Sequence, residues 1–285
     1  MSSTTSPATG FYGAKNIRWN LWFGAIVVGL TTLISFVSLF WTPYLTTGIN
    51  IRARLQGPSW EHWLGTDPFG RDILSLLMAG SQNALLIGVV SVLIGMTIGV
   101  AVGLVAAARG GLMEEVAMRG SDFIFSFPVV LSAIMLAAIW GPGSINSIVA
   151  IGIYSIPIFA RVTRGSAKTI WTREFVLAAR ASGKGTLSIS IMHILPNIIN
   201  IIVVQATITF AVAILADAAL SFLGLGTPPP TPSWGRMLKE AQTFMTQSPH
   251  VAIFPGLAIA FIVLALNLLG DGLRDLLDPR FTSER

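Results

Sequence analysis

Residues 173–183 read REFVLAARASG, and residues 194–197 read ILPN. They belong to the longest strongly polar break between two apolar blocks on their side of the predicted membrane. Glu174 falls in the first turn of a predicted helix, where a carboxylate meets the positive helix end. Gly183 is the expected stop with a positive φ, since glycine tolerates the left-handed conformation that ends helices. The segment therefore predicts a helix, a sharp turn and a second short helix.

The flanking residues of this segment refine that prediction. Thr172 is expected to cap the first helix and Thr186 the second, because threonine side chains accept hydrogen bonds from free helix N–H groups. Pro196 suits the first turn of the apolar helix that follows. Ala178 and Ala179 leave a shallow surface on which another protein can sit closely. An ordinary loop at the membrane surface is the alternative interpretation.

The composition indicates an integral membrane protein. The chain has 285 residues, of which 53% are hydrophobic and 11% charged, and its mean hydropathy is +0.73. Soluble domains carry about 25% charged residues. There is no cysteine, which excludes disulfides and thiolate metal sites. The net charge of +5 is only a weak argument for nucleic acid, because basic residues in a membrane protein more often report the side on which a loop lies.

Six apolar runs are interpreted as membrane helices, each needing about 20 apolar residues to cross the hydrocarbon core. The fourth run is short and is interrupted by Pro157. Gly88, Gly95, Gly99 and Gly103 form one stripe of the second run, which favours close packing against another helix. The six runs are Trp19–Trp41, Ala84–Ala108, Phe123–Trp140, Ile145–Ala160, Asn197–Ala216 and Val251–Leu269.

Basic residues are divided unevenly between the two predicted sides of the membrane. The N-terminal tail, a charged loop expected at residues 109–122, the segment 161–196 and the C-terminal tail hold 13 of the 18 Lys and Arg, and the two outer loops hold 5. Because cytoplasmic loops are enriched in these residues, both termini and the segment 172–196 are predicted to be cytoplasmic. This bias would collapse if the fourth run did not cross the membrane.

Asp217 is the only acidic residue deep in an apolar run. A charged Asp at the centre of a span costs about 2.5–3.5 kcal/mol on insertion scales. About twenty residues, or roughly 30 Å of helix, separate it from Asn197, so it is expected near the outer end. A hydrogen bond at the helix end or inside the bundle is the main interpretation, and a gate or pathway contact is the alternative.

The polar segment resembles the "EAA" coupling loop of binding-protein-dependent ABC importer permeases. The family pattern is Glu-Ala-Ala, three residues, Gly, nine residues, Ile, one residue, Leu-Pro. Leu177 stands where the pattern has Glu, with the acid instead at Glu174, and His193 stands where Ile is usual. The residues that match are Ala178, Ala179, Gly183, Leu195 and Pro196.

Four further segments resemble the C-type subunit of the dipeptide, oligopeptide and nickel permease family. Taken alone, the first of them indicates turns leading into an amphipathic helix, and the last indicates a short helix at the membrane surface. The four are LGTDPFGRDILS at 64–75, LSFLGLG at 220–226, PTPSWG at 230–235 and GDGLRDLLDP at 270–279.

The resemblance implies an all-α membrane protein, with six transmembrane helices and a fold like that of type I ABC importer permeases. It further implies a homologous B-type permease subunit, two ATPase subunits, an extracytoplasmic substrate-binding protein and surrounding membrane lipid as partners, with no nucleic acid. The chain has no G-x-x-x-x-G-K-[ST] phosphate loop. No cofactor is therefore expected in this chain, and ATP and Mg²⁺ are expected in the ATPase subunits.

By the same resemblance the solute is a di- or oligopeptide, or else nickel or another small solute, and the location is a bacterial inner membrane. Residues 1–80 are expected to hold the N-tail, the first span and an outer loop; residues 81–271 form the five-helix permease core, and 272–285 the C-tail. A stand-alone channel or secondary transporter is the rival class, although Asp217 alone qualifies for ion coupling. An intramembrane enzyme is a weaker rival, because the spans hold no paired acids, Ser/His pair or metal-ligand cluster.

Overall fold

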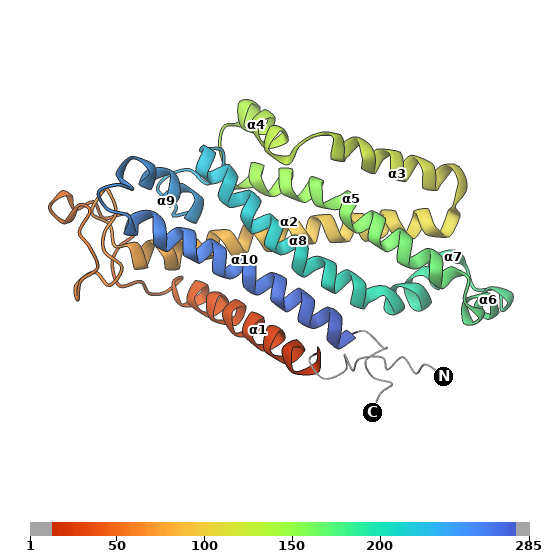
Figure 1. The fold of residues 1–285 in the computed structure, drawn as a ribbon. Helices are drawn as coiled ribbons and strands as arrows, with labels where there is room; N and C mark the ends of the chain where they lie inside the picture. The colour runs from red at the N-terminus through yellow and green to blue at the C-terminus, as the bar shows by residue number, and fades with distance from the viewer. Residues whose placement is uncertain (1–12, 278–285) are drawn as a thin grey trace, which may run out of the picture.

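The computed structural model describes residues 13–277, with side chains described from Trp19 onward. In this range the elements in chain order are α1 (Gly13–Val37), η1 (Ile51–Ala53), α2 (Ile73–Arg109), α3 (Gly111–Ser126), α4 (Val129–Trp140), α5 (Ser144–Trp171), α6 (Glu174–Ala181), α7 (Thr186–Ile189), η2 (Ser190–Ile194), α8 (Leu195–Leu223), α9 (Trp234–Ala241), η3 (Gln242–Phe244) and α10 (His250–Leu277). The long helices run alongside one another, with α9 at one end and α6 and α7 at the other (Figure 1).

The apolar helices of the described chain agree with a membrane-spanning bundle. Five of them are long and apolar enough to cross a membrane: α1, α2, α5, α10, and α8 with the turns that precede it. α3 and α4 pass the same test only as a pair bent by 76°. The predicted all-helical membrane protein is thus confirmed, with five apolar spans, or six when the bent pair is counted as one.

The third span differs most from its prediction. Gly110 and Gly111 have φ values of +62° and +54°, so the chain reverses immediately after α2 and enters α3. Phe127 is extended, with φ −98° and ψ 117°, because a residue that precedes a proline disfavours the helical region. α3 therefore stops before Pro128 and α4 starts after it. The charged loop expected at residues 109–122 is wrong, since this stretch is helical apart from Gly110.

α2 begins in the outer loop, well before the apolar run from which it was predicted. The Asp72 carboxylate accepts a hydrogen bond from the Ser75 N–H at 2.8 Å, which caps the helix. The helix therefore starts at Ile73 rather than at the predicted Ala84. The expectation that the segment 64–75 turns into a helix is confirmed.

Two other helices also extend beyond the apolar runs from which they were predicted. α5 continues from the predicted end at Ala160 to Trp171, so Arg161, Arg164 and Lys168 lie on a helix rather than in a loop. α10 continues to Leu277. The short surface helix expected at 270–279 is therefore not a separate element, and residues 278–279 lie outside the described part of the chain.

The glycine stripe on α2 explains why α2 and α5 pack so closely. A Cβ added at Gly95 would lie 2.3 Å from the Ser155 Cβ, and one added at Gly99 would lie 2.5 Å from the Ile156 carbonyl oxygen. Backbones at this distance leave no room for side chains, as is common where membrane helices touch. The predicted packing role of the stripe is confirmed.

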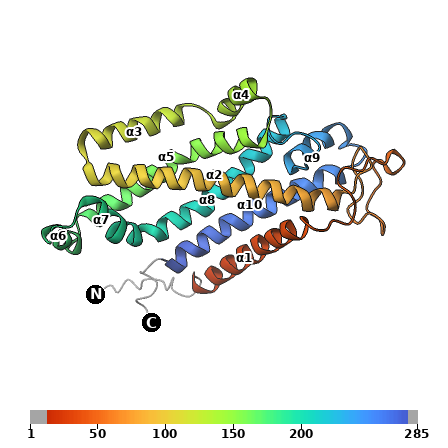
Figure 2. The ribbon, with the colours of Figure 1, turned by 180° about the vertical axis from the view of Figure 1, so that it is seen from behind.

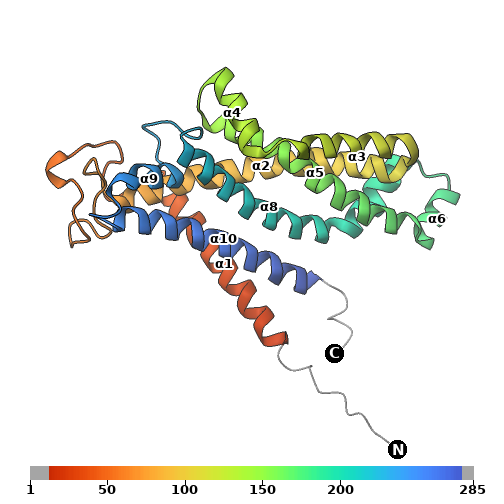
Figure 3. The same cartoon turned by 45° about the horizontal axis from the view of Figure 1, so that its top comes forward.

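Seen from behind, α2 crosses the back of the bundle, and α3 lies beside the half of α2 that is nearer to α6 and α7 (Figure 2). α1 lies at one edge against α10, and the two helices diverge from their crossing point (Figure 3). A Cβ added at Gly24 of α1 would lie 2.6 Å from the Ala265 carbonyl oxygen of α10. We call the end that carries α6 and α7 the inner end, and the end that carries α9 and residues 42–72 the outer end.

Candidate functional site

α6 is joined to α5 by a single tight turn. The Arg173 N–H donates to the Ile170 carbonyl at 3.0 Å, and α6 starts at Glu174. The Thr172 hydroxyl donates to the Thr169 carbonyl at 3.0 Å, so it belongs to the end of α5. The predicted capping role of Thr172 is wrong, because Arg173 occupies the N-cap position and makes no side-chain cap bond.

Gly183 ends α6 with a complete C-cap. Its φ is +80°. The Lys184 N–H donates to the Ala179 carbonyl at 3.2 Å, and the Gly183 N–H donates to the Arg180 carbonyl at 3.0 Å. These two bonds are the Schellman arrangement, which satisfies carbonyls that the helix leaves free. The predicted helix stop and positive φ are confirmed.

The two faces of α6 differ sharply. Val176 is fully buried and Ala179 is half-buried in the cluster formed by α2, α5 and α8. Ala178 and Glu174 are exposed, and Phe175, at 46% exposure, shows that apolar surface faces outward too. The predicted pair of alanines is therefore divided, with Ala179 facing the bundle and Ala178 facing away from it.

The second short helix is continuous with the span that follows. Thr186 is the first residue of α7, and Gly185 occupies the N-cap position, so the predicted capping role of Thr186 is wrong. α7 widens into the π-turn η2 and then enters α8, with Pro196 in its first turn as predicted. Leu195 is half-buried and Pro196 is exposed, while the fully buried Ile194 fixes the junction in the core.

A set of ion pairs beside this segment was missed by the sequence analysis. Glu114 of α3 accepts from Arg164 Nε at 2.6 Å and from Lys168 Nζ at 2.7 Å, both on α5. Asp122 of α3 pairs with Arg161 of α5. Arg161, Arg164 and Lys168 recur at helical spacing on one face of α5. The sequence contained this spacing, but the prediction placed these residues in a loop rather than on a helix.

Asp217 lies near the other end of α8 and is not part of the α6 segment. It is 3% exposed, and its carboxyl lies beside Ser147 of α5 and Ser221 of α8. Within residues 13–277, its Oδ1 and both serine hydroxyls have no hydrogen-bond partner. The predicted position near the outer end is confirmed, and the choice between a structural and a gating role stays open.

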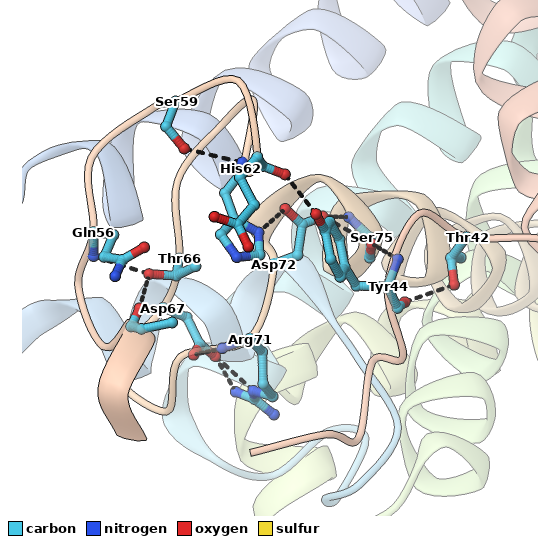
Figure 4. A network of polar contacts seen from close by, with 12 residues as sticks. Thr42, Tyr44, Gln56, Ser59, His62, Thr66, Asp67, Arg71, Asp72 and Ser75 are labelled. Atoms are coloured by element: carbon cyan, nitrogen blue, oxygen red, sulfur yellow. Dashed lines mark hydrogen bonds and ion pairs between the residues drawn. The ribbon is translucent and has the colours of Figure 1, made fainter. Parts of the chain in front are cut away.

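The outer end is organised around Asp72 (Figure 4). One oxygen of Asp72 lies 3.0 Å from His62 Nδ1, and the other accepts from the Ser75 hydroxyl at 2.8 Å. The Tyr44 N–H in turn donates to the Ser75 hydroxyl oxygen at 3.0 Å, and the Tyr44 hydroxyl donates to the Glu61 carbonyl at 2.7 Å. These bonds tie residues 42–63 to the start of α2.

Asp67 forms the second centre of the outer end (Figure 4). It accepts from the Phe69 and Arg71 N–H groups at 2.8 and 2.9 Å and from Arg71 Nε at 2.6 Å. Arg71 reaches Glu240 of α9 at 2.8 Å, and Glu240 lies 3.2 Å from Arg236. This chain of charges joins the outer loop to α9.

The comparison with protein families finds one match. A family model described as "Binding-protein-dependent transport system inner membrane component" matches residues 99–283. That range includes α6 and the whole segment 172–196.

Curated relatives match most of the chain. The glutathione transport system permease protein GsiD of Pectobacterium atrosepticum is 44% identical over 264 residues, which are 91% of this chain and 88% of that protein. The dipeptide transport system permease protein DppC of Alkalihalophilus pseudofirmus is 42% identical over 262 residues, 90% and 86% of the two chains. GsiD of Escherichia coli O1:K1 is 48% identical over 225 residues, 79% and 74% of the two chains.

Among solved structures, the MetNI methionine ABC transporter in inward-facing conformations matches with a TM-score of 0.60. The match covers 71% of this chain and 96% of that chain, at 20% sequence identity. Identity this low speaks for the fold alone.

Proposed function

Because the chain belongs to the family of binding-protein-dependent transport system inner membrane components, and is therefore a permease subunit of an ABC importer, we propose that it lines half of a pore for di- or oligopeptides. A homologous B-type permease forms the other half. Two ATPase subunits bind ATP and Mg²⁺ and dock at the inner end, and a substrate-binding protein delivers the solute at the outer end. This chain itself carries out no chemistry.

The observation that carries the proposal is the form of α6. It is a short helix, closed at its end by the Gly183 cap, that stands at the inner end between two spans (Figure 1). Glu174 and Ala178 are exposed there, together with apolar side chains such as Leu177, which is 51% exposed. Exposed apolar groups are typical of the core of a protein interface. We assign the ATPase contact to this face.

The connections of α6 explain how a push from the ATPases reaches the pore. Val176 is fully buried against the bundle, so α6 and the core move together. On the far side of Gly183, α7 and η2 lead into α8 without a break, with Leu195 and Pro196 at the junction. A rigid helix displaced by ATP binding therefore moves α5 and α8, whereas a loose loop would absorb the motion. Alternating access follows from this displacement.

The peptide class of solute rests on the relatives. Two of them are named as glutathione and dipeptide permeases, and both solutes contain amide-linked amino acids. Nickel or another small solute is the alternative that the same machinery would serve. Asp217 is proposed to meet a local structural need rather than to contact the solute.

We further propose that the inner end faces the cytoplasm of a bacterium, with both termini on that side. The excess of Lys and Arg on the loops and helix ends of this side supports the orientation. The permease core is assigned to residues 81–271, preceded by a first span that lies at the edge of the bundle and followed by a C-tail at 272–285.

The test is uptake by the four-subunit complex in proteoliposomes. We expect the permease to co-purify with stoichiometric ATPase subunits, and dipeptide uptake to require ATP on the α6 side together with the binding protein on the α9 side. Uptake that proceeds without ATP and is abolished by an ionophore would instead indicate a secondary transporter. Uptake with ATP and the binding protein on the same side would contradict the orientation.

A further inference from the structure

A polar chamber opens at the outer end, between the C-terminus of α8, the proline-rich turn at residues 228–230 and α9. Its volume is about 380 Å³. Ser221, Thr227, Arg236, Lys239 and Glu240 contribute its polar walls, and prolines line much of the rest. The chamber is separate from the α6 segment, which lies at the opposite end of the bundle (Figure 1).

One cation at this chamber stands outside its ion pairs. Glu240 pairs with Arg236 at 3.2 Å and with Arg71 at 2.8 Å, and Arg71 also pairs with Asp67 at 2.6 Å. Lys239 has no carboxylate within 4.0 Å among residues 19–277. The ion pairs therefore engage Glu240, Arg236 and Arg71, and they leave Lys239, whose side chain lines the chamber, without a carboxylate partner.

Lys239 is held close to the end of α8. A Cβ added at Gly224 would lie 2.3 Å from the Lys239 Nζ, so the ammonium lies directly against this glycine. Gly224 is the C-cap of α8, with φ +88°, and free carbonyls at a helix C-terminus attract a cation. The absence of a side chain at position 224 thus leaves space for the ammonium at the chamber wall.

One buried donor at the chamber makes no hydrogen bond within the described chain. It is Nε of Arg236, a residue that is 7% exposed. Arg236 Nε lies near Glu240 as an ion pair but makes no hydrogen bond with it. Leaving buried donors unpaired is costly, and native structures usually satisfy them. A ligand that accepts hydrogen bonds and carries negative charge would satisfy Arg236 Nε and would also pair with Lys239.

We propose that this chamber binds a carboxylate group of the transported solute as the solute enters the pore from the outer side. The inference rests on the proposed function, because peptides supply the carboxylate. Lys239 provides the unpaired charge, and Arg236 provides a planar fork of donors suited to a carboxylate. The site selects solutes with a free carboxyl terminus over those in which it is blocked.

The experiment measures binding to the purified four-subunit complex without its binding protein, by isothermal titration calorimetry. The probes are dialanine and glutathione, which carry free carboxylates, and dialaninamide, in which the carboxylate is replaced by an amide. We expect Lys239→Gln to weaken dialanine and glutathione binding by about tenfold, as for a lost charge-assisted contact. Binding of dialaninamide to the wild type should be weak, and Lys239→Gln should not weaken it further.

Arg52→Gln is the matched control, because it removes one exposed positive charge at the outer end away from the chamber. It should leave the affinity for dialanine unchanged. Equal losses for both variants, equal affinity for dialanine and its amide, or no binding of either free carboxylate would overturn the chamber assignment. Assembly with the ATPases and ATP-driven uptake by the wild type test the proposed function separately. A complex that transports normally but fails the carboxylate test loses this inference alone.

Discussion

The two ends of the bundle are built by different means. At the outer end, buried side chains hold residues 42–72 and α9 through Asp72 and through the chain Asp67, Arg71 and Glu240. At the inner end, α6 is held by one fully buried side chain, Val176, and by backbone hydrogen bonds at its C-cap. Residues 42–72 thus use their buried carboxylates on their own fold and on α9, whereas α6 leaves most of its side chains exposed.

This difference matters for a machine that is driven from one end. A partner can bind α6 without disrupting the fold, because the bonds that shape α6 are between backbone groups. At the outer end, the side chains of Asp67, Arg71 and Asp72 are already paired inside the network (Figure 4). We infer that the outer network sets the shape of the entrance, and that the inner helix transmits force.

The comparison is tested most strongly by Asp67→Ala at the outer end. The substitution removes three hydrogen bonds to the carboxylate and leaves Arg71, whose side chain is 11% exposed, with one partner fewer. Breaking a buried ion pair costs about 3–5 kcal/mol. We expect the thermal unfolding midpoint of the purified permease to fall sharply, and the outer loop to become sensitive to protease.

Glu115→Ala is the control for this substitution. Glu115 pairs with Arg119 at 2.6 Å, but the two side chains are 55% and 77% exposed. Exposed pairs of this kind contribute about 0.3–0.5 kcal/mol, so the midpoint should barely move. Similar losses in the two variants would show that the outer network is not a special source of stability.

A middle-sized effect is expected from Gly183→Val at the inner end. The φ of +80° is strained for any residue with a Cβ, at a cost of about 1–2 kcal/mol. A Cβ at this position would meet nothing within 4 Å, so the cost comes from the backbone and not from a clash. We expect normal membrane abundance but loss of ATP-driven uptake, because the C-cap and the direction of α6 change together.

Gly183→Asn separates backbone strain from the mere loss of glycine. Asparagine tolerates the left-handed region better than valine does, so uptake should be largely retained. The measurement is ATPase activity and dipeptide uptake in reconstituted complexes, with membrane abundance as a control. Normal uptake by Gly183→Val would mean that α6 does not couple ATP hydrolysis to transport.

Local rules explain what the sequence predicted correctly. Gly183 and Pro196 act within one helical turn, and their roles follow from backbone geometry alone. The glycine stripe on α2 was readable for the same reason. The predicted cap at Thr172 was wrong because the Thr172 hydroxyl donates to the Thr169 carbonyl instead. A sequence pattern cannot decide between two nearby partners.

Features that depend on tertiary pairing were out of reach. Pro128 was visible in the sequence as a residue that can kink a helix, but the sequence does not give the 76° bend between α3 and α4. The pairs of Glu114 with Arg164 and Lys168 join α3 to α5, and a single sequence does not say which helices become neighbours. The chamber at Lys239 likewise depends on the packing of α9 against the end of α8.

The smallest effect is expected from Asp217→Asn. This substitution tests whether transport needs the charge of the carboxylate in the outer half of α8, or whether a polar group that packs there is enough. Asparagine has nearly the same shape, keeps one carbonyl oxygen and adds an N–H₂ group that can donate to the Ser147 and Ser221 hydroxyls, which lack partners within residues 13–277. A local hydrogen-bonding role is therefore preserved, and a neutral amide costs less to bury than an unpaired charge. We expect the unfolding midpoint and dipeptide uptake to stay within about twofold of wild type, a change worth less than about 0.5 kcal/mol. A large loss of uptake in a complex that assembles normally would show that the carboxylate acts in the pathway, and would place a second functional site on α8 beside the outer chamber.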